Sequence, residues 1–358
     1  MTNFNTPEWD KKFRSIFADI RQNKCVVLVG PEILKIGTRS LRDVLRNQLK
    51  ETNDDDIAHY YERDGFFLFR DKIAKEDVQR EVVLFYQDHN LGKEIAEDLL
   101  LKLVRLKGHV ILSINPDTFL SDVAFKYGIK HRFAYFQHGG TAVQDVELPT
   151  GDMPLFYNLC GSLERDDSLI LDYDDLFRLL SSLLGSPGLP PNLALALQQA
   201  KHFLFVGFNF DKWYSQLLLR LLSGEKAIRK FAIDPSEKND NTTTFLVKQF
   251  GIEFIEDEQA FLMELIHRAE NAGLYREKME TKTPLAVRII HFLQNGEVLS
   301  ALNHLKTNEK AQQTALLLLA QYHDLKDREA RKILDNRDYT IQYNRIADAI
   351  LETLKTDL

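Results

Sequence analysis

Cysteine is scarce in this chain. Only two of its 358 residues are Cys, Cys25 and Cys160, and they are far apart with no CxxC spacing. A structural zinc site needs about four ligands in tetrahedral geometry, and two thiols cannot supply a four-cysteine site. Both cysteines lie in apolar runs, where a free Cys is usually a small buried hydrophobe. We therefore expect no metal site, and a reducing compartment such as the cytoplasm.

Long hydrophobic runs are also missing. No apolar stretch reaches the roughly 18 residues that a membrane-spanning helix needs. The first residues lack the basic start and apolar core of a secretory signal. The net charge is −7, which provides no general attraction for nucleic acid. These absences predict a cytoplasmic protein that binds neither a membrane nor nucleic acid.

The chain does contain short apolar runs that alternate with stretches of helical periodicity. Alternation of this kind predicts an α/β domain with a parallel sheet covered on both faces. The predicted strands are rich in Val, Ile, Leu and Phe, as buried parallel strands are. They cover residues 25–29, 110–114, 133–137, 155–159, 202–206, 231–235 and 252–255.

One stretch within this domain, residues 54–107, has a mostly helical pattern. It also holds a group of aromatic residues that are more typical of packing on the sheet than of a ligand site. These are Tyr60, Tyr61, Phe66, Phe67 and Phe69. We expect a helical insert here.

The composition changes near residue 271. A charged and polar stretch follows, after which no strand pattern occurs. We predict an α/β domain over residues 1–270, a linker over 271–284 and a small all-α bundle over 285–358. The helices expected in the bundle are 285–293, 298–305, 311–335 and 340–354.

Three sequence fragments are informative when they are taken in chain order. They are KCVVLVGPE at 24–32, ILSINPD at 111–117 and LFYNLCGS at 155–162. Together they resemble the nucleotide-binding core of the sirtuin-like family, whose members bind NAD and break its bond to nicotinamide. The fragment FVGFNFDKW at 205–213 is similar to sirtuin-like proteins of bacterial defence systems. The resemblance implies a Rossmann-like fold, NAD or an ADP-ribose-like nucleotide as ligand, and a homo-oligomer. Two cysteines cannot form the zinc ribbon of sirtuin deacetylases, so that branch of the family is excluded.

The resemblance also implies a set of nucleotide-binding residues. The family usually has Gly-Ala-Gly after the first strand, whereas this chain has Gly30, Pro31 and Glu32. Pro31 removes a backbone donor, and Glu32 would place negative charge near a diphosphate. The other implied binding positions are Gly161, Gly207, Asn209 and Asp234. For Asn209 an N-cap, and for Asp234 an Asp-Pro turn, are the alternatives.

Asn115 and Asp117 match the family's Asn-x-Asp element, whose side chains lie near the scissile bond. Their alternative role is a turn that closes a strand. Cys160 occupies the position of the family's catalytic His, which acts as a general base. A Cys could replace it only as a thiolate, which needs an electropositive and partly exposed setting. His138 is the one nearby alternative base.

The helical C-terminal region resembles the effector-associated domains of bacterial conflict proteins, which recognise matching domains on partners. Its alternative is a simple four-helix bundle. We therefore predict a catalytically degraded sirtuin-like sensor, scaffold or adaptor of a defence system that recruits a protein partner through residues 285–358. An active NAD hydrolase, and a structural oligomer with no nucleotide site, remain the competing hypotheses.

Overall fold

The computed structural model divides the chain into two compact units, Met1–Met279 and Glu280–Leu358. We describe each unit by itself. The structure describes residues 3–53, 55–88, 90–137, 146–185, 188–208, 210, 212–223, 229–233, 240–255, 258–277, 285–294, 298–331, 333 and 336–357.

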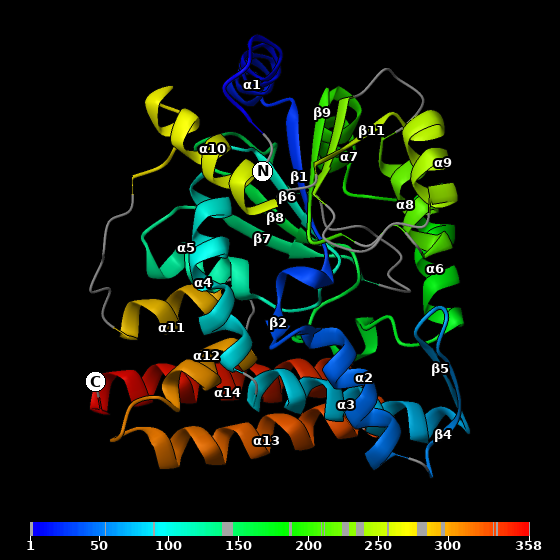
Figure 1. Cartoon of the computed structure of the whole chain (residues 1–358). Coiled ribbons are helices and arrows are strands. Elements are labelled where there is room, and N and C mark those ends of the chain that lie inside the picture. Colours follow the sequence, from blue (N-terminus) through cyan, green and yellow to red (C-terminus); the bar gives the residue numbers. More distant parts are fainter. Residues whose placement is uncertain are drawn as a thin grey trace. The chain divides into compact units, whose positions relative to one another are not determined.

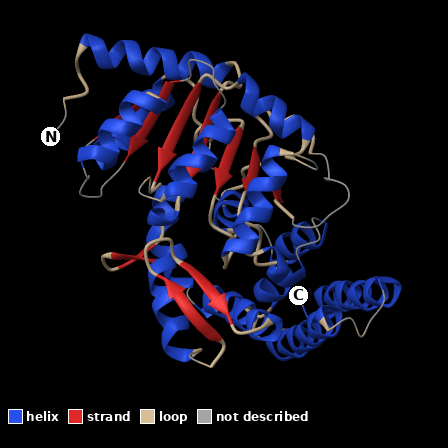
Figure 2. Cartoon of the chain, turned by 90° about the vertical axis from the view of Figure 1, so that its right-hand side faces the viewer, coloured by secondary structure: helices blue, strands red, loops and turns tan. Residues whose placement is uncertain are grey.

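A seven-stranded sheet forms the centre of the first unit, and all its pairings are parallel (Figures 1 and 2). Its order is β11-β10-β9-β1-β6-β8-β7. The strands are β1 (Cys25–Val29), β6 (Val110–Ser113), β7 (Arg132–Tyr135), β8 (Leu155–Asn158), β9 (His202–Val206), β10 (Arg229–Ile233) and β11 (Ile252–Ile255). Each predicted strand is confirmed, with small differences at its ends. The Rossmann-like fold class is confirmed with them.

Helices cover both faces of this sheet. On one face, α6 (Tyr173–Leu184), α7 (Pro191–Gln199), α8 (Trp213–Ser223) and α9 (Asp240–Phe250) share a single apolar core with alternate residues of the strands. On the other face, α1 (Pro7–Arg21) contacts β1 and α10 (Glu258–Asn271). Phe13 of α1 stacks on Phe261 of α10 with ring centroids 5.6 Å apart. The remaining helices of the unit are α2 (Leu41–Thr52), α3 (Lys72–Asp88), α4 (Asn90–Arg105) and α5 (Phe119–Lys126).

The predicted helical insert contains a β-hairpin. Helices α3 and α4 make the insert mostly helical, as predicted. Strands β4 (Ile57–Tyr61) and β5 (Phe66–Phe69), which pair antiparallel, were not predicted. Aromatic side chains suit strands, and Gly65 adopts φ +78° in the turn between the two strands. The hairpin is attached to the rest of the unit, since the Phe67 N–H donates to the carbonyl of Leu171 (2.9 Å).

The segment after α10 also packs on the first unit. Arg276 donates to the backbone carbonyls of four residues, which are Val104, Leu106, Gly108 and Gly151. Leu106 and Tyr275 form an antiparallel bridge beside it. Residues 272–277, which we assigned to a linker, are therefore fastened to the α/β unit by these bonds.

The second unit contains four described helices: α11 (Leu285–Gln294), α12 (Val298–Leu305), α13 (Gln312–Ala330) and α14 (Asn336–Asp357). They match the four predicted helical stretches. Helix α12 contacts the three others, and its Ala301, Leu302 and Leu305 are completely buried. In the described part of the whole chain, no helix combines the length and apolarity that a membrane crossing requires.

Candidate functional site

The order of the sheet determines where a ligand site would lie. From β1 the chain first adds β6 and its neighbours on one side, and then β9, β10 and β11 on the other. The connections thus change direction between β1 and β9. In open α/β sheets, ligands bind at the carboxyl ends of the strands beside such a switch point.

Gly30 and Gly207 follow β1 and β9, and their turns are in direct backbone contact. The Gly30 N–H donates to the Val206 carbonyl (2.9 Å), and the Glu32 N–H donates to the Gly207 carbonyl (3.0 Å). A Cβ on Gly30 would lie 2.1 Å from that Gly207 oxygen. The packing of one turn on the other therefore requires both glycines. The two turns meet where doubly wound folds usually leave a crevice for a ligand.

The chain after Gly30 does not enter a long helix. It forms the short 3-10 helix η1 (Pro31–Ile33) and then the two-residue strands β2 (Lys35–Ile36) and β3 (Arg39–Ser40). Helix α2 begins only at Leu41, capped by the Ser40 hydroxyl, which accepts from the Asp43 N–H (3.2 Å). Gly30 therefore does not adjoin the N-terminus of a long helix, unlike the glycine turn of an ordinary doubly wound nucleotide-binding fold.

Asn115 and Asp117 follow β6 and are both buried. The Asn115 side-chain amide donates to the Gly30 carbonyl (3.2 Å), which links the ends of β6 and β1. An Asp117 carboxylate oxygen accepts from the Phe119 N–H (3.0 Å) at the start of α5. Its backbone carbonyl accepts from the Asn158 side chain (2.8 Å). Both residues therefore have structural partners at the carboxyl edge, as the turn alternative predicts, and their contact with a ligand stays a prediction.

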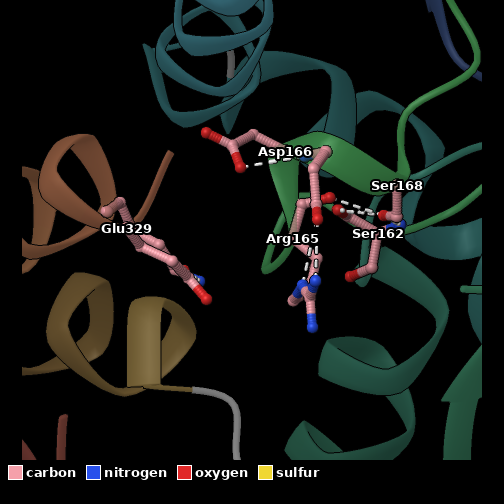
Figure 3. A network of polar contacts seen from close by, with 7 residues as sticks. Ser162, Arg165, Asp166, Ser168 and Glu329 are labelled. Atoms are coloured by element: carbon pink, nitrogen blue, oxygen red, sulfur yellow. Dashed lines mark hydrogen bonds and ion pairs between the residues drawn. The ribbon is translucent and has the colours of Figure 1, made fainter. Parts of the chain in front are cut away.

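Gly161 lies in a tight loop after β8. It has φ +83°, and a Cβ there would be 2.1 Å from the Ser168 carbonyl oxygen. The Ser168 hydroxyl accepts from the Ser162 N–H (2.9 Å) and donates to the Ser162 carbonyl (3.2 Å), and Arg165 lies in the same network (Figure 3). This closed loop requires glycine for its own packing, so it explains Gly161 with no ligand present.

A cavity of about 70 Å³ lies at the carboxyl edge beside these turns. Its wall is mostly apolar, with a small number of polar side chains. Those polar side chains are Arg42 and Arg46 of α2, Tyr86 of α3, Tyr214 of α8, Asn115 after β6 and Cys160 after β8. Among the described residues that line it, there is no His, Asp or Glu.

Cys160 is half-buried in this wall. Burial raises the pKa of its thiol to about 11, and the positive charge of Arg42 opposes that rise only in part. The thiol is therefore neutral near pH 7 and is not a proton acceptor. Cys160 thus lines the cavity in a setting that disfavours the thiolate, and its equivalence to the family's His stays a prediction.

Three buried histidines, His109, His131 and His202, lie at the amino ends of β6, β7 and β9. That is the edge of the sheet opposite the cavity. His202 pairs with Asp19 of α1 (Nδ1 to Oδ2, 2.6 Å). His131 contacts the Ser121 hydroxyl (2.6 Å). These three side chains belong to the packed interior at the amino ends of the strands and do not line the cavity.

Three residues proposed from the sequence, namely His138, Asn209 and Asp234, lie outside the described residues. Sequence reasoning missed Arg42 and Arg46. Their only signal in the sequence was the i, i+4 spacing, which also suits an ordinary solvated helix face. Within the described residues, no group of three or more His, Cys, Asp and Glu side chains is placed to hold a metal ion.

Comparison with known families finds two matches. Residues 109–255 match the SIR2-like domain, a range that begins at β6 and so excludes Gly30 and α2. Residues 284–356 match effector-associated domain 11. No curated protein matches the chain. The chain is therefore similar to a SIR2-like domain over residues 109–255 and to effector-associated domain 11 over residues 284–356.

Proposed function

We propose that this protein is a catalytically degraded SIR2-like protein that acts as a sensor or scaffold in a bacterial defence system. The α/β unit would hold NAD or a related nucleotide without cleaving it. The C-terminal helical unit, residues 285–358, would recruit a protein partner. The two matched domains support a module of this kind.

One observation is the main support for the proposed loss of catalysis. The cavity at the carboxyl edge is lined, among described residues, by neither an imidazole nor a carboxylate, and its thiol is held neutral. Hydrolysis of a glycosidic bond needs a group that accepts a proton from water or a ribose hydroxyl. A general base contributes on the order of 10²–10⁴ in rate, so its absence removes most of the turnover.

The turns at the switch point support the same proposal. The contact between Gly30 and Gly207 brings two backbones together where a diphosphate would lie in an ordinary doubly wound fold. A ligand held by this unit would therefore use other groups. This is the reason that we expect a single substitution at Cys160 to be insufficient for turnover.

The test is incubation of the purified full-length chain with NAD while released nicotinamide is measured. We expect none above the no-protein control, either for the wild type or for Cys160→His. The competing hypothesis is an active NAD hydrolase with His138 as base. Sustained nicotinamide release that Asn115→Ala or His138→Ala abolishes would establish that hypothesis and refute ours.

Partner recruitment needs a separate test. The most informative candidate is a protein encoded by a neighbouring gene that carries its own effector-associated domain. We expect it to co-purify with the full chain, and we expect Leu317→Glu on α13 to weaken the complex, because Leu317 is 61% exposed. Leu148→Glu, at a leucine of the α/β unit that is 51% exposed, is the control. Equal retention of the partner by both variants would contradict the assignment of α13 to the interface.

A further inference from the structure

Helix α2 presents two guanidinium groups to the cavity at the carboxyl edge. Arg42 and Arg46 are four residues apart, so they lie on one face of the helix, one turn from each other. Both line the cavity together with the apolar or aromatic side chains of Phe66, Tyr86 and Tyr214. Two like charges are thus held close to one another in surroundings that contain little polar solvation.

Close carboxylate partners do not compensate this pair of charges. The ion pair of Arg46 with Asp43 is long, at 4.0 Å, and the other oxygen of Asp43 accepts from the Ser40 hydroxyl (2.7 Å). Within the described residues, Arg42 has no ion pair with a carboxylate within 4.0 Å. Burial acts to lower the pKa of Arg42, and nearby groups that include Asp43 outweigh it and raise that pKa. Buried charges in proteins are usually paired, because an unpaired one loses its hydration with nothing in exchange.

The position of Arg46 is determined by the β4–β5 hairpin. Gly65 leaves room for the guanidinium, since a Cβ on Gly65 would lie 2.3 Å from Cζ of Arg46. The side chain of Arg46 is only 12% exposed. Burial and the positive charge of Arg42 both lower the pKa of Arg46, although a guanidinium stays protonated at neutral pH. The hairpin therefore holds a permanent cation at a defined place in the wall.

The chemistry of the pair favours one class of ligand. Guanidinium groups bind phosphate oxygens through two parallel N–H donors, and a doubly charged phosphate would neutralise both arginines. On the measure that gives this cavity about 70 Å³, one water molecule needs only roughly 10–15 Å³. The cavity therefore has room for a group larger than water, such as a phosphate.

We infer that Arg42 and Arg46 form a binding site for a phosphate group, supplied by free phosphate or by the phosphates of a nucleotide. This inference deepens the proposed function, since it places the anionic part of the ligand on α2 instead of at the turn after β1.

Calorimetry on the full-length chain tests the site, with inorganic phosphate, pyrophosphate, ADP-ribose and adenosine as probes. We expect pyrophosphate to bind, and adenosine, which has no phosphate, not to bind. ADP-ribose binding more tightly than pyrophosphate would identify a nucleotide as the source of the phosphate. Tighter binding of inorganic phosphate or pyrophosphate would identify the free anion.

Variants then locate the site. Arg42→Ala and Arg46→Ala should each weaken pyrophosphate binding at least tenfold, and Arg46→Lys should weaken it less, because it keeps the charge but loses the forked geometry. Arg39→Ala, at an exposed arginine of β3 just before α2, is the matched control and should bind as the wild type does.

Two results would overturn the inference. One is wild-type protein that gives neither heat nor a change in melting temperature with millimolar phosphate or pyrophosphate, relative to potassium chloride at equal ionic strength. The other is unchanged pyrophosphate affinity in a folded Arg42→Ala/Arg46→Ala double variant. Anion binding together with NAD turnover would instead refute the proposed function and leave this site intact.

Discussion

The protonation state of Cys160 can be measured directly through the pH dependence of its alkylation. Iodoacetamide reacts with the thiolate, so the rate of modification follows the thiolate fraction. With a pKa of about 11, that fraction is ~0.03% at pH 7.5, whereas a thiol of ordinary pKa near 8.5 is ~10% ionised. The difference is roughly 300-fold in the reactive species.

We expect the alkylation rate of Cys160 to rise about tenfold for each pH unit between roughly pH 7 and pH 10, with no plateau in that interval. Peptide mass spectrometry follows the modification at Cys160 separately from Cys25. Cys25 is fully buried, which raises its pKa further, and a Cys25→Ser variant removes it as a source of signal. The shape of the profile matters more than its height, because limited access lowers the rate equally at every pH.

A plateau near pH 8 or below would refute this reasoning. It would show that Cys160 is an ordinary or activated thiol, able to accept a proton at neutral pH. The catalytic loss proposed for the α/β unit would then have to be reconsidered, because that proposal depends on a neutral thiol at this position.

Two further predictions concern stability. Gly207→Ala should lower the free energy of unfolding by about 2–4 kcal/mol, because the new Cβ would meet the Ile33 nitrogen at 2.6 Å. Gly37→Ala, at the same φ of +62° but with open space around it, should cost only about 1 kcal/mol in urea denaturation, and equal losses would contradict the packing role. His109 is buried and its pKa is lowered to about 4 from 6.5, so its contribution to stability is present above about pH 6.5 and is lost as the pH falls towards 4. We expect His109→Leu to remove roughly 2–3 kcal/mol of the stability difference between about pH 7 and pH 4.5, and an unchanged difference would show that His109 is not the group responsible.

The hydrophobic pattern of the sequence was sufficient to predict the elements of the sheet and of the helical unit. Continuous apolar runs such as 25–29 and 202–206 are buried on both faces, and this burial is what the pattern encodes. The hairpin at Ile57–Tyr61 and Phe66–Phe69 was missed, because a short aromatic run is compatible with a helix or a strand until its partner is known.

The candidate site, like the fold, could be predicted from the sequence only in part. The sequence by itself determined that glycines follow β1 and β9 and that a cysteine stands where an imidazole was expected. Only the tertiary structure decided that Gly30 and Gly207 pack on each other, and that Arg42 and Arg46 line a cavity under the hairpin. Contacts between residues far apart in the chain depend on the order of the strands, and that order follows from packing over the whole sheet rather than from any local pattern.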